Sequence, residues 1–264
     1  MNVFVRGADP RGPHEVLVLP AGSERRMNRI TRMACTDAFR TLNTARITSV
    51  DGIYESTGLG CLEDTERFLT EMTTIEGGLL SPTSFMRSTH NTMAGQLALL
   101  LHAEGPNITF SQELFSFHLV LLQAILHLSA SPGHIVLVAA VDERTPLLEQ
   151  VLTSETEPVI GEGAASFLLS GKAGENDVAR VIEIWNGTLA NATTWQERFH
   201  HHNVDPMRTD VAVVGRDPFS GAAPWTPKNA GIIDIRERIA WYGSASAQLF
   251  SEGLAQIALL ERKP

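Results

Sequence analysis

Cysteine is scarce in this sequence, with only Cys35 and Cys61 among 264 residues. Two cysteines cannot form a disulfide framework or, by themselves, a zinc site, and such scarcity suits a reducing compartment. No other pattern in the chain indicates a bound metal or a cofactor. We therefore expect a cytoplasmic protein that carries neither.

Basic charge and long hydrophobic runs are lacking as well. The net charge is −9, which disfavours wholesale binding to nucleic acid or to an anionic membrane. The longest apolar segment is interrupted by His118 and His127 and falls short of the ~20 residues of a membrane span. Charged residues and proline break the first fifteen residues before the apolar core of a signal peptide could form. We expect no membrane span, no secretion and no nucleic-acid partner.

The common catalytic motifs are also missing. The sequence has no G-x-S-x-G elbow, no P-loop, no H-E-x-x-H, and no cysteine near a histidine and an asparagine. Gly58 and Gly60 form G-x-G, but Glu63 stands where a dinucleotide fingerprint has its third glycine. The run His200–His202 points adjacent side chains in different directions, which is unsuited to metal binding. The residues alone indicate no catalytic set.

The stretch from Gly105 to Val141 is the most informative segment that is present. A turn precedes the β-prone Ile108–Phe110, an apolar helix is predicted from Leu114 to Leu128, and Ile135–Val141 has no polar residue. This order is typical of a β-α-β unit in a parallel sheet covered on both faces. Because the helix is apolar on nearly every side, we expect it inside a layered α/β domain.

Three further elements are predicted from residue patterns. A strand is expected at Glu15–Leu19, and a helix with Ala94, Leu97, Ala98 and Leu101 on one face is expected to stop at Gly105. A last helix is expected from about Ser246 to Leu260.

An arginine-rich helix is predicted near the beginning of the chain. Apolar residues recur at helical spacing from Ser23, a candidate N-cap, to Leu42. The same segment carries Arg25, Arg26, Arg29 and Arg32. These arginines form either a solvated face or a docking patch for an acidic partner.

Several short motifs, spread over most of the chain, together resemble the β-ketoacyl synthases of the thiolase-like superfamily. The resemblance is closest to the short synthase-like proteins and chain-length factors of aryl-polyene and flexirubin pathways. The motifs are Thr57–Thr65 (TGLGCLEDT), Ser81–Phe85 (SPTSF), Ser88–Thr92 (STHNT), Gly105–Thr109 (GPNIT), Gly161–Ala165 (GEGAA) and Tyr242–Ala247 (YGSASA).

This resemblance implies the fold. We expect an α/β, layered αβαβα thiolase-like architecture with mixed sheets, a buried central helix and a trimmed C-terminal half. Residues 1–264 would form one ketoacyl-synthase-like domain, with pseudo-halves of about 1–155 and 156–264.

The resemblance also implies that the chain does not catalyse condensation. An active synthase places a cysteine on the strand-to-helix elbow, and the position counted from Gly105-Pro106 is Leu114. Two supporting histidines are replaced as well, by Val214 after one strand and by Trp241 near the C-terminus. Leucine, valine and tryptophan can neither attack a thioester nor transfer protons.

The leading hypothesis is a non-catalytic, chain-length-factor-like subunit. It would pair with an active β-ketoacyl synthase, as a heterodimer or larger assembly, shape a product tunnel and meet an acyl carrier protein. The arginines Arg25, Arg26, Arg29 and Arg32 are candidate carrier-protein contacts. Tunnel or interface candidates are Ile108, Thr109, Phe110, Leu114, Phe115, Phe117, His118, His90 and Asn91.

Two alternatives remain open at this point. One is a divergent acyltransferase or decarboxylase that acts on acyl-carrier-protein thioesters through His90, His118 or Cys61. The other is a homodimeric carrier-protein docking scaffold without a tunnel, in which the arginine face matters more than the elbow.

Overall fold

A computed structural model describes residues 3–8, 19–74, 80–112, 116–152, 162–175, 177–181, 212–215 and 231–234. Its main sheet has six strands in the order β3-β2-β4-β5-β1-β6. The strands are β1 (Val3–Ala8), β2 (Gly52–Thr57), β3 (Asn107–Ser111), β4 (Ile135–Asp142), β5 (Gly163–Ser170) and β6 (Ala179–Val181). A second, parallel pair consists of β7 (Ala212–Gly215) and β8 (Gly231–Asp234).

The main sheet is mixed. Strand β2 runs parallel to both β3 and β4, whereas β5 is antiparallel to β4 and to β1. Every residue of β2 is buried, as is nearly all of β4, which is typical of strands covered on both faces. The expected mixed α/β architecture is thus confirmed.

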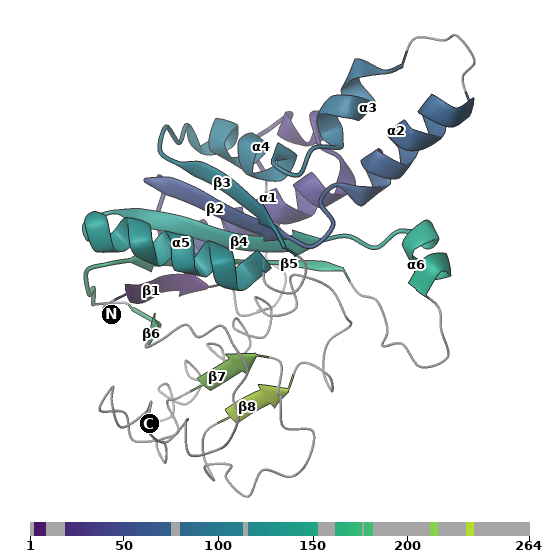
Figure 1. Cartoon of the computed structure of the whole chain (residues 1–264). Coiled ribbons are helices and arrows are strands. Elements are labelled where there is room, and N and C mark those ends of the chain that lie inside the picture. The colour runs from purple at the N-terminus through teal and green to yellow at the C-terminus, as the bar shows by residue number, and fades with distance from the viewer. Residues whose placement is uncertain are drawn as a thin grey trace, which may run out of the picture.

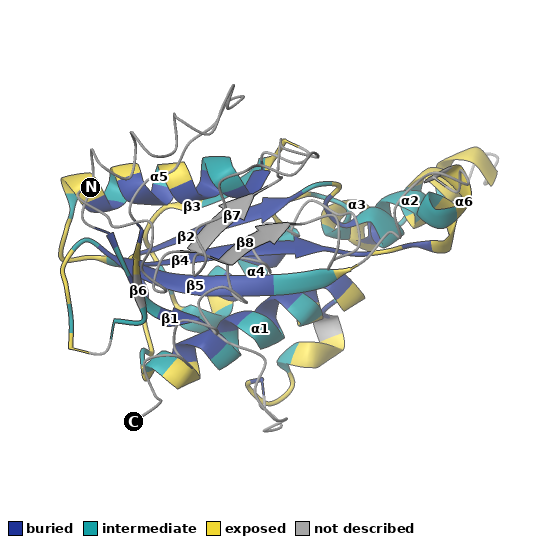
Figure 2. Ribbon diagram, turned by 90° about the horizontal axis from the view of Figure 1, so that it is seen from below, coloured by how far each residue is buried: buried dark blue, intermediate teal, exposed yellow. Residues whose placement is uncertain are grey.

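Helices cover the two faces of this sheet (Figures 1 and 2). Helices α1 (Arg29–Ala45) and α4 (Thr92–Leu101) pack on one face, and α5 (Ser116–Ala130) packs on the other. Helices α2 (Leu62–Thr74) and α3 (Pro82–Arg87) extend beyond the sheet, as does the short α6 (Pro146–Leu152). None of the helices in the described ranges is long and apolar enough to cross a membrane.

The arginine-rich segment folds differently from the sequence-based expectation. Ser23 begins a short 3-10 helix, Ser23–Arg26, and does not cap α1. The N-cap is Asn28, whose side chain accepts a hydrogen bond from the Thr31 N–H at 2.9 Å. Asn28 also donates to the Asp64 carboxylate at 2.5 Å, so one amide caps α1 and ties it to α2.

The end of α4 also differs from expectation. Gly105 was the predicted C-terminal stop, but the helix ends at His102, which adopts the left-handed conformation with φ 51°. Gly105 is needed for another reason, because a Cβ at that position would collide with the backbone of Asp51. The predicted strand at Glu15–Leu19 and the predicted last helix lie outside the described residues, apart from Leu19 itself.

Strand β2 carries a buried carboxyl group, Glu55, on the face covered by α4. The side chain is fully buried, and neither oxygen has a hydrogen-bond partner of regular geometry among the described residues. Burial raises the pKa of Glu55 to about 8, while the backbone of Ala94 lowers it by a smaller amount. Glu55 is therefore mostly protonated in the folded chain at neutral pH.

This buried carboxyl predicts a pH dependence of stability. The folded chain holds the Glu55 proton up to about pH 8, whereas the unfolded chain releases it near the ordinary value of 4.5. The contribution of Glu55 to the free energy of unfolding is therefore fully present below pH 4.5. It is lost as pH rises through 8, by about 1.4 kcal/mol per pH unit.

Glu55→Gln should remove this contribution while preserving shape. Urea unfolding of both proteins between pH 5 and pH 8 measures it. The wild type should lose stability relative to the variant as pH rises, and parallel curves would contradict the assignment.

Candidate functional site

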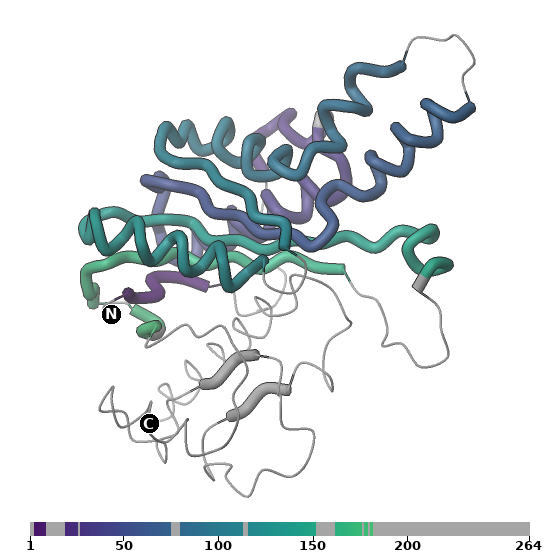
Figure 3. The backbone as a smooth tube through the Cα atoms, viewed as in Figure 1, coloured from purple at the N-terminus to yellow at the C-terminus, as the bar shows by residue number. Residues whose placement is uncertain are grey.

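The topology indicates one edge of the main sheet as the place for a site. From β2 the chain reaches β3 by way of α4 on one face, and β3 reaches β4 by way of α5 on the other face (Figure 3). Strands β3 and β4 thus lie on opposite sides of β2. In open α/β sheets, ligands bind at the carboxyl ends of the strands where the order reverses in this way. We call this edge of β3, β2 and β4 the carboxyl edge.

One carboxylate joins the strands at the carboxyl edge. Asp142, at the end of β4, accepts hydrogen bonds from the Thr57 hydroxyl at 3.0 Å and from the Gly58 N–H at 2.6 Å. The Thr57 hydroxyl oxygen accepts from the Gly60 N–H at 2.9 Å. The Ser111 hydroxyl, at the end of β3, donates to the Gly58 carbonyl at 3.1 Å. These bonds fix the loop after β2 relative to both neighbouring strands.

The TGLG motif has a steric role in this loop. Gly60 has φ +71°, and a Cβ there would lie 2.8 Å from Cδ2 of His90. The glycine therefore lets the His90 ring pack directly on the turn. His90 itself is exposed, and the adjacent Asn91 precedes α4 without capping it through its side chain.

Cys61 follows this turn but lacks the properties of a nucleophile. Its side chain is fully buried with Ile30, Ala34, Met93 and Val141 on the face covered by α1 and α4. Burial raises the pKa of the thiol to about 12, an effect that hydrogen bonding to Asn28 opposes. The thiol is therefore neutral at physiological pH, whereas attack on a thioester requires the thiolate.

A thiol-reactivity measurement tests this interpretation of the two cysteines. Cys35 is also fully buried, and its pKa is likewise raised to about 12 by burial. We expect neither thiol to react with a water-soluble disulfide reagent at pH 7.5 in the folded protein, and both to react in denaturant. Rapid labelling of native Cys61 alone would instead support the enzymatic alternative.

The elbow between β3 and α5 lies at the same edge. The Gln112 N–H donates to the Ser116 hydroxyl at 2.8 Å, so the first residue of α5 is tied to the end of β3. Leu114, which the sequence predicts at the nucleophile position, and its neighbour Phe115 lie outside the described residues. Trp241 does too, and of Val214 only the position within β7 is described.

The other predicted tunnel or interface residues divide between the two faces of the sheet. Ile108 and Phe110 pack against the core under α5, where Phe117 is buried with its ring 5.8 Å from that of Phe167. His118 is half-buried on α5. His90 and Asn91 precede α4, which covers the other face. The structure thus gathers β3 and the start of α5, with His90 and Asn91 on the α4 side.

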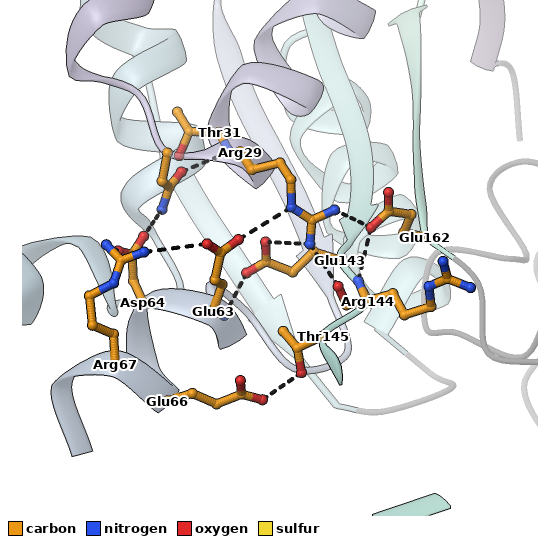
Figure 4. Close-up of polar contacts among 11 residues, drawn as sticks. Arg29, Thr31, Glu63, Asp64, Glu66, Arg67, Glu143, Arg144, Thr145 and Glu162 are labelled. Carbon is orange, nitrogen blue, oxygen red and sulfur yellow. Dashed lines mark hydrogen bonds and ion pairs between the residues drawn. The ribbon is translucent and has the colours of Figure 1, made fainter. Parts of the chain in front are cut away.

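An ionic cluster borders the carboxyl edge (Figure 4). Arg29, at the start of α1, contacts Glu63 at 3.3 Å, Glu143 at 3.3 Å and Glu162. It also donates to the Arg144 carbonyl at 2.7 Å. Glu162 belongs to the GEGAA motif, which was singled out in the sequence, but its partner was not predicted.

The carboxylates of this cluster have different environments. Burial raises the pKa of Glu143, although the Glu63 backbone N–H and the Arg29 charge partly offset it. Partial burial opposes ionisation of Glu162, but hydrogen bonds from Arg29 and from the Arg144 backbone N–H outweigh it and lower that pKa. Arg29 therefore stabilises negative charge that would be unfavourable without it.

The four arginines proposed for docking are thus not equivalent. Arg25 and Arg32 are exposed, while the side chain of Arg26 is not described. The charge of Arg29 is largely balanced by three carboxylates. Among the described residues, no group of three or more histidine, cysteine, aspartate or glutamate side chains is arranged to bind a metal ion.

Removal of Arg29 should destabilise the chain. The Glu143 side chain is only 2% exposed and would lose its cationic partner, whereas Arg29 itself is 42% exposed. We expect Arg29→Met to lower the free energy of unfolding by about 1–3 kcal/mol, less than the loss for a fully buried pair.

Arg32→Met is the matched control, because Arg32 lies on the same helix and is exposed. It should change stability by less than about 0.5 kcal/mol. Denaturant unfolding at pH 7 measures both, and equal effects of the two variants would contradict the role given to Arg29.

Comparison with known families gives one match. Residues 6–201 match the family described as Beta-ketoacyl synthase, N-terminal domain. Among curated proteins, none matches this sequence.

Solved structures are similar over 63% to 98% of the chain. A structure of the ketosynthase ApeO with its chain length factor ApeC from Xenorhabdus doucetiae is 27% identical, with TM-score 0.50, over 63% of this chain and 67% of that chain. The ishigamide ketosynthase/chain length factor is 18% identical, with TM-score 0.67, over 91% and 75%. The AntDE:AntF complex of a type II PKS acyl-carrier protein with its ketosynthase is 14% identical, with TM-score 0.68, over 98% and 92%. The last two likenesses concern the fold alone.

Proposed function

Because the chain belongs to the β-ketoacyl synthase family, we propose that it is a non-catalytic, chain-length-factor-like subunit. It pairs with an active β-ketoacyl synthase and helps to shape the tunnel that holds a growing polyene or polyketide chain. The ApeO–ApeC likeness, at 27% identity, supports a place in a ketosynthase/chain length factor pair, since that structure contains one protein of each kind. Leucine at position 114, where the family resemblance expects a cysteine, favours the non-catalytic member of the pair. The aryl-polyene or flexirubin class is the pathway that the sequence motifs favour.

The edge strand β3 is the observation that carries the proposal. Among the described residues, it is the terminal strand of the main sheet and is paired with β2 on one side only. Its sequence, Asn107–Ser111, contains neither a charged residue nor proline, the usual devices that prevent edge strands from pairing. Such an edge is suited to pairing with another sheet.

The register shows which backbone groups face outward. Ile53 pairs with Asn107, and its N–H donates to the Pro106 carbonyl at 2.8 Å. In a parallel ladder a residue bonds to the residues before and after its partner, so the even-numbered residues of β3 bond to β2. The N–H and C=O groups of Asn107, Thr109 and Ser111 therefore face the open side of β3.

Exposed apolar side chains on the three helices that lie between β2 and β3 in the sequence also favour a protein partner. Leu99 on α4 is 72% exposed, and α4 packs against β3. On the α2–α3 pair, which is held together by Phe68 and Phe85, the side chains of Leu69, Met72, Phe85 and Met86 are all exposed. Apolar surface gathered in this way is typical of an interaction site. We assign the synthase subunit as its occupant, continuous with β3.

The roles of the remaining candidates follow from their positions. Ile108, Phe110 and Phe117 would form the apolar wall beneath the elbow, with Leu114 at the position of the missing nucleophile. The exposed Arg25 and Arg32 are the cations available to an acidic carrier protein, while Arg29 is held in its ionic cluster. The neutral, buried thiol of Cys61 argues against the enzymatic alternative.

Thr109→Pro tests the assembly. Proline removes an outward N–H, so the ladder between β3 and β2 stays intact while pairing with a partner is blocked. Thr109→Val is the matched control, because it keeps the N–H and replaces a hydroxyl for which the described part of the chain provides no hydrogen-bond partner. A catalytic β-ketoacyl synthase from the organism that encodes this chain is co-expressed with each variant.

We expect the wild type and Thr109→Val to form a heterodimer with the synthase, measured by light scattering. Thr109→Pro should raise the dissociation constant of the heterodimer by about ten-fold or more, which corresponds to about 1.4 kcal/mol of binding free energy. Product chain length, measured by mass spectrometry, should change when the heterodimer is lost. A wild-type chain that stays monomeric and leaves the product unchanged would contradict the proposal, and a homodimer alone would favour the scaffold alternative.

A further inference from the structure

Three side chains form a hydrogen-bonded chain at the end of the sheet opposite the carboxyl edge. The Tyr54 hydroxyl, on β2, lies 2.5 Å from Nδ1 of His127, in the last turn of α5. Nε2 of His127 lies 2.8 Å from Nδ1 of His134, in the loop before β4. Tyr54 is 1% exposed, whereas His134 is exposed. The row of hydrogen bonds therefore leads from the apolar core to the surface.

Few charged or titratable groups face His127. Besides Tyr54 and His134, Asp51 acts on it electrostatically from the segment before β2. The Asp51 carboxylate also accepts a hydrogen bond from the Ile135 N–H at 2.8 Å, at the start of β4. On the helix itself, the His127 carbonyl accepts from the Ser131 N–H at 2.9 Å. These contacts join α5, β2 and β4 at one point.

One arrangement of protons allows both hydrogen bonds to form while all three side chains are neutral. Tyr54 donates its hydroxyl hydrogen to Nδ1 of His127. His127 carries its own hydrogen on Nε2 and donates it to Nδ1 of His134. The hydrogen of His134 is then on Nε2, which is free to contact solvent. Each imidazole thus serves once as donor and once as acceptor within its neutral capacity.

One added proton disturbs this arrangement wherever it resides. If it resides on His134, Nδ1 of His134 becomes a donor, so Nε2 of His127 must accept and the hydrogen of His127 moves to Nδ1. If it resides on His127, both nitrogens of that ring carry hydrogens. In either case Nδ1 of His127 bears a hydrogen, and the Tyr54 hydroxyl must accept instead of donate. The hydroxyl hydrogen then loses its acceptor inside the core, which is unfavourable.

We propose that Tyr54, His127 and His134 form a proton-responsive latch that holds the C-terminal end of α5 on the sheet and opens on protonation of the histidine pair. Opening avoids the stranded hydroxyl, because His127 and His134 can then separate and each contact water. The latch acts on the helix whose N-terminal end lies at the carboxyl edge. It is a property of the chain itself and does not depend on the proposed function.

The direction of the response follows from the environment of His127. Burial, and next the neighbouring His134, lower the pKa of His127, while Asp51 raises it by a smaller amount. The folded chain therefore takes up the proton less readily than the unfolded chain. The stabilisation is present above the ordinary histidine range near pH 6.5 and is lost as pH falls below it. Glu55 has the opposite sign, so it cannot produce a loss of protection in acid.

Hydrogen exchange of the full-length protein tests the latch. Amide protection of residues 128–135, corrected for the intrinsic effect of pH on exchange, is measured at pH 7.5 and pH 5.5. In the wild type, the amide protection of this segment should fall by about ten-fold between pH 7.5 and pH 5.5. This is a fraction of the roughly hundred-fold rise in proton activity over the same range. Leu137 and Leu168, in the centre of the sheet, are internal controls and should not lose protection.

His127→Asn keeps an acceptor near the Tyr54 hydroxyl but cannot be protonated, so its protection should change by less than two-fold. Tyr54→Phe removes the hydroxyl that would be stranded, and nitrogen NMR should show His127 titrating at higher pH than in the wild type. The same NMR experiment should find the hydrogen of His127 on Nε2 at pH 7.5. Unchanged protection in the wild type, equal loss in His127→Asn, or an unshifted titration in Tyr54→Phe would each overturn the proposal.

Discussion

The bonds that Asp142 accepts from Thr57 and Gly58 hold the carboxyl edge together. Parallel strands bring their carboxyl ends to one edge, but their register does not fix the loops that leave them. Asp142 supplies that constraint, because one buried carboxylate at the end of β4 orients the whole turn after β2. Gly60, the His90 ring above it and the Ser111 contact from β3 all take their positions from this turn.

The ionic cluster extends this constraint to the helices outside the sheet. Arg29 joins the start of α1 to α2, to the loop after β4 and to the beginning of β5 through carboxylates from three segments. Asn28, the adjacent residue, caps α1 and also binds Asp64. Two consecutive residues thus place α1 and α2 relative to the carboxyl edge. An arginine used in this way contributes little to a basic docking surface, and this separates Arg29 from Arg25 and Arg32.

The sequence predicted those elements whose signal is local. The uninterrupted apolar strand at β4 followed from its residue pattern, because burial on both faces leaves no polar positions. The apolar run also located the helix α5, although Leu122 and Leu126 on it are exposed. Predictions from local sequence signals failed where a contact with a residue distant in the sequence determines the local structure. Asn28, not Ser23, caps α1 because its amide also binds Asp64, 36 positions away. Gly105 is placed in the sequence to end α4, but a glycine is required there because the backbone of Asp51 lies too close to leave room for a Cβ. The partners of Glu162 come from other segments, so no spacing rule could reveal them.

Two buried polar groups on β2 give the chain opposite responses to protons. Glu55 and Tyr54 are neighbours in sequence, so they point to opposite faces of the sheet, one under α4 and the other under α5. On the α4 face, acid favours the folded state because the neutral carboxyl is the form that tolerates burial. On the α5 face, acid disturbs a hydroxyl whose acceptor is a neutral imidazole. Mild acid therefore favours the burial of Glu55 under α4 while it loosens one end of α5. Strand β2 carries both groups, and acid favours the burial of Glu55 on one of its faces. The C-terminal end of α5 can therefore open on the other face while the sheet that carries β3 stays folded.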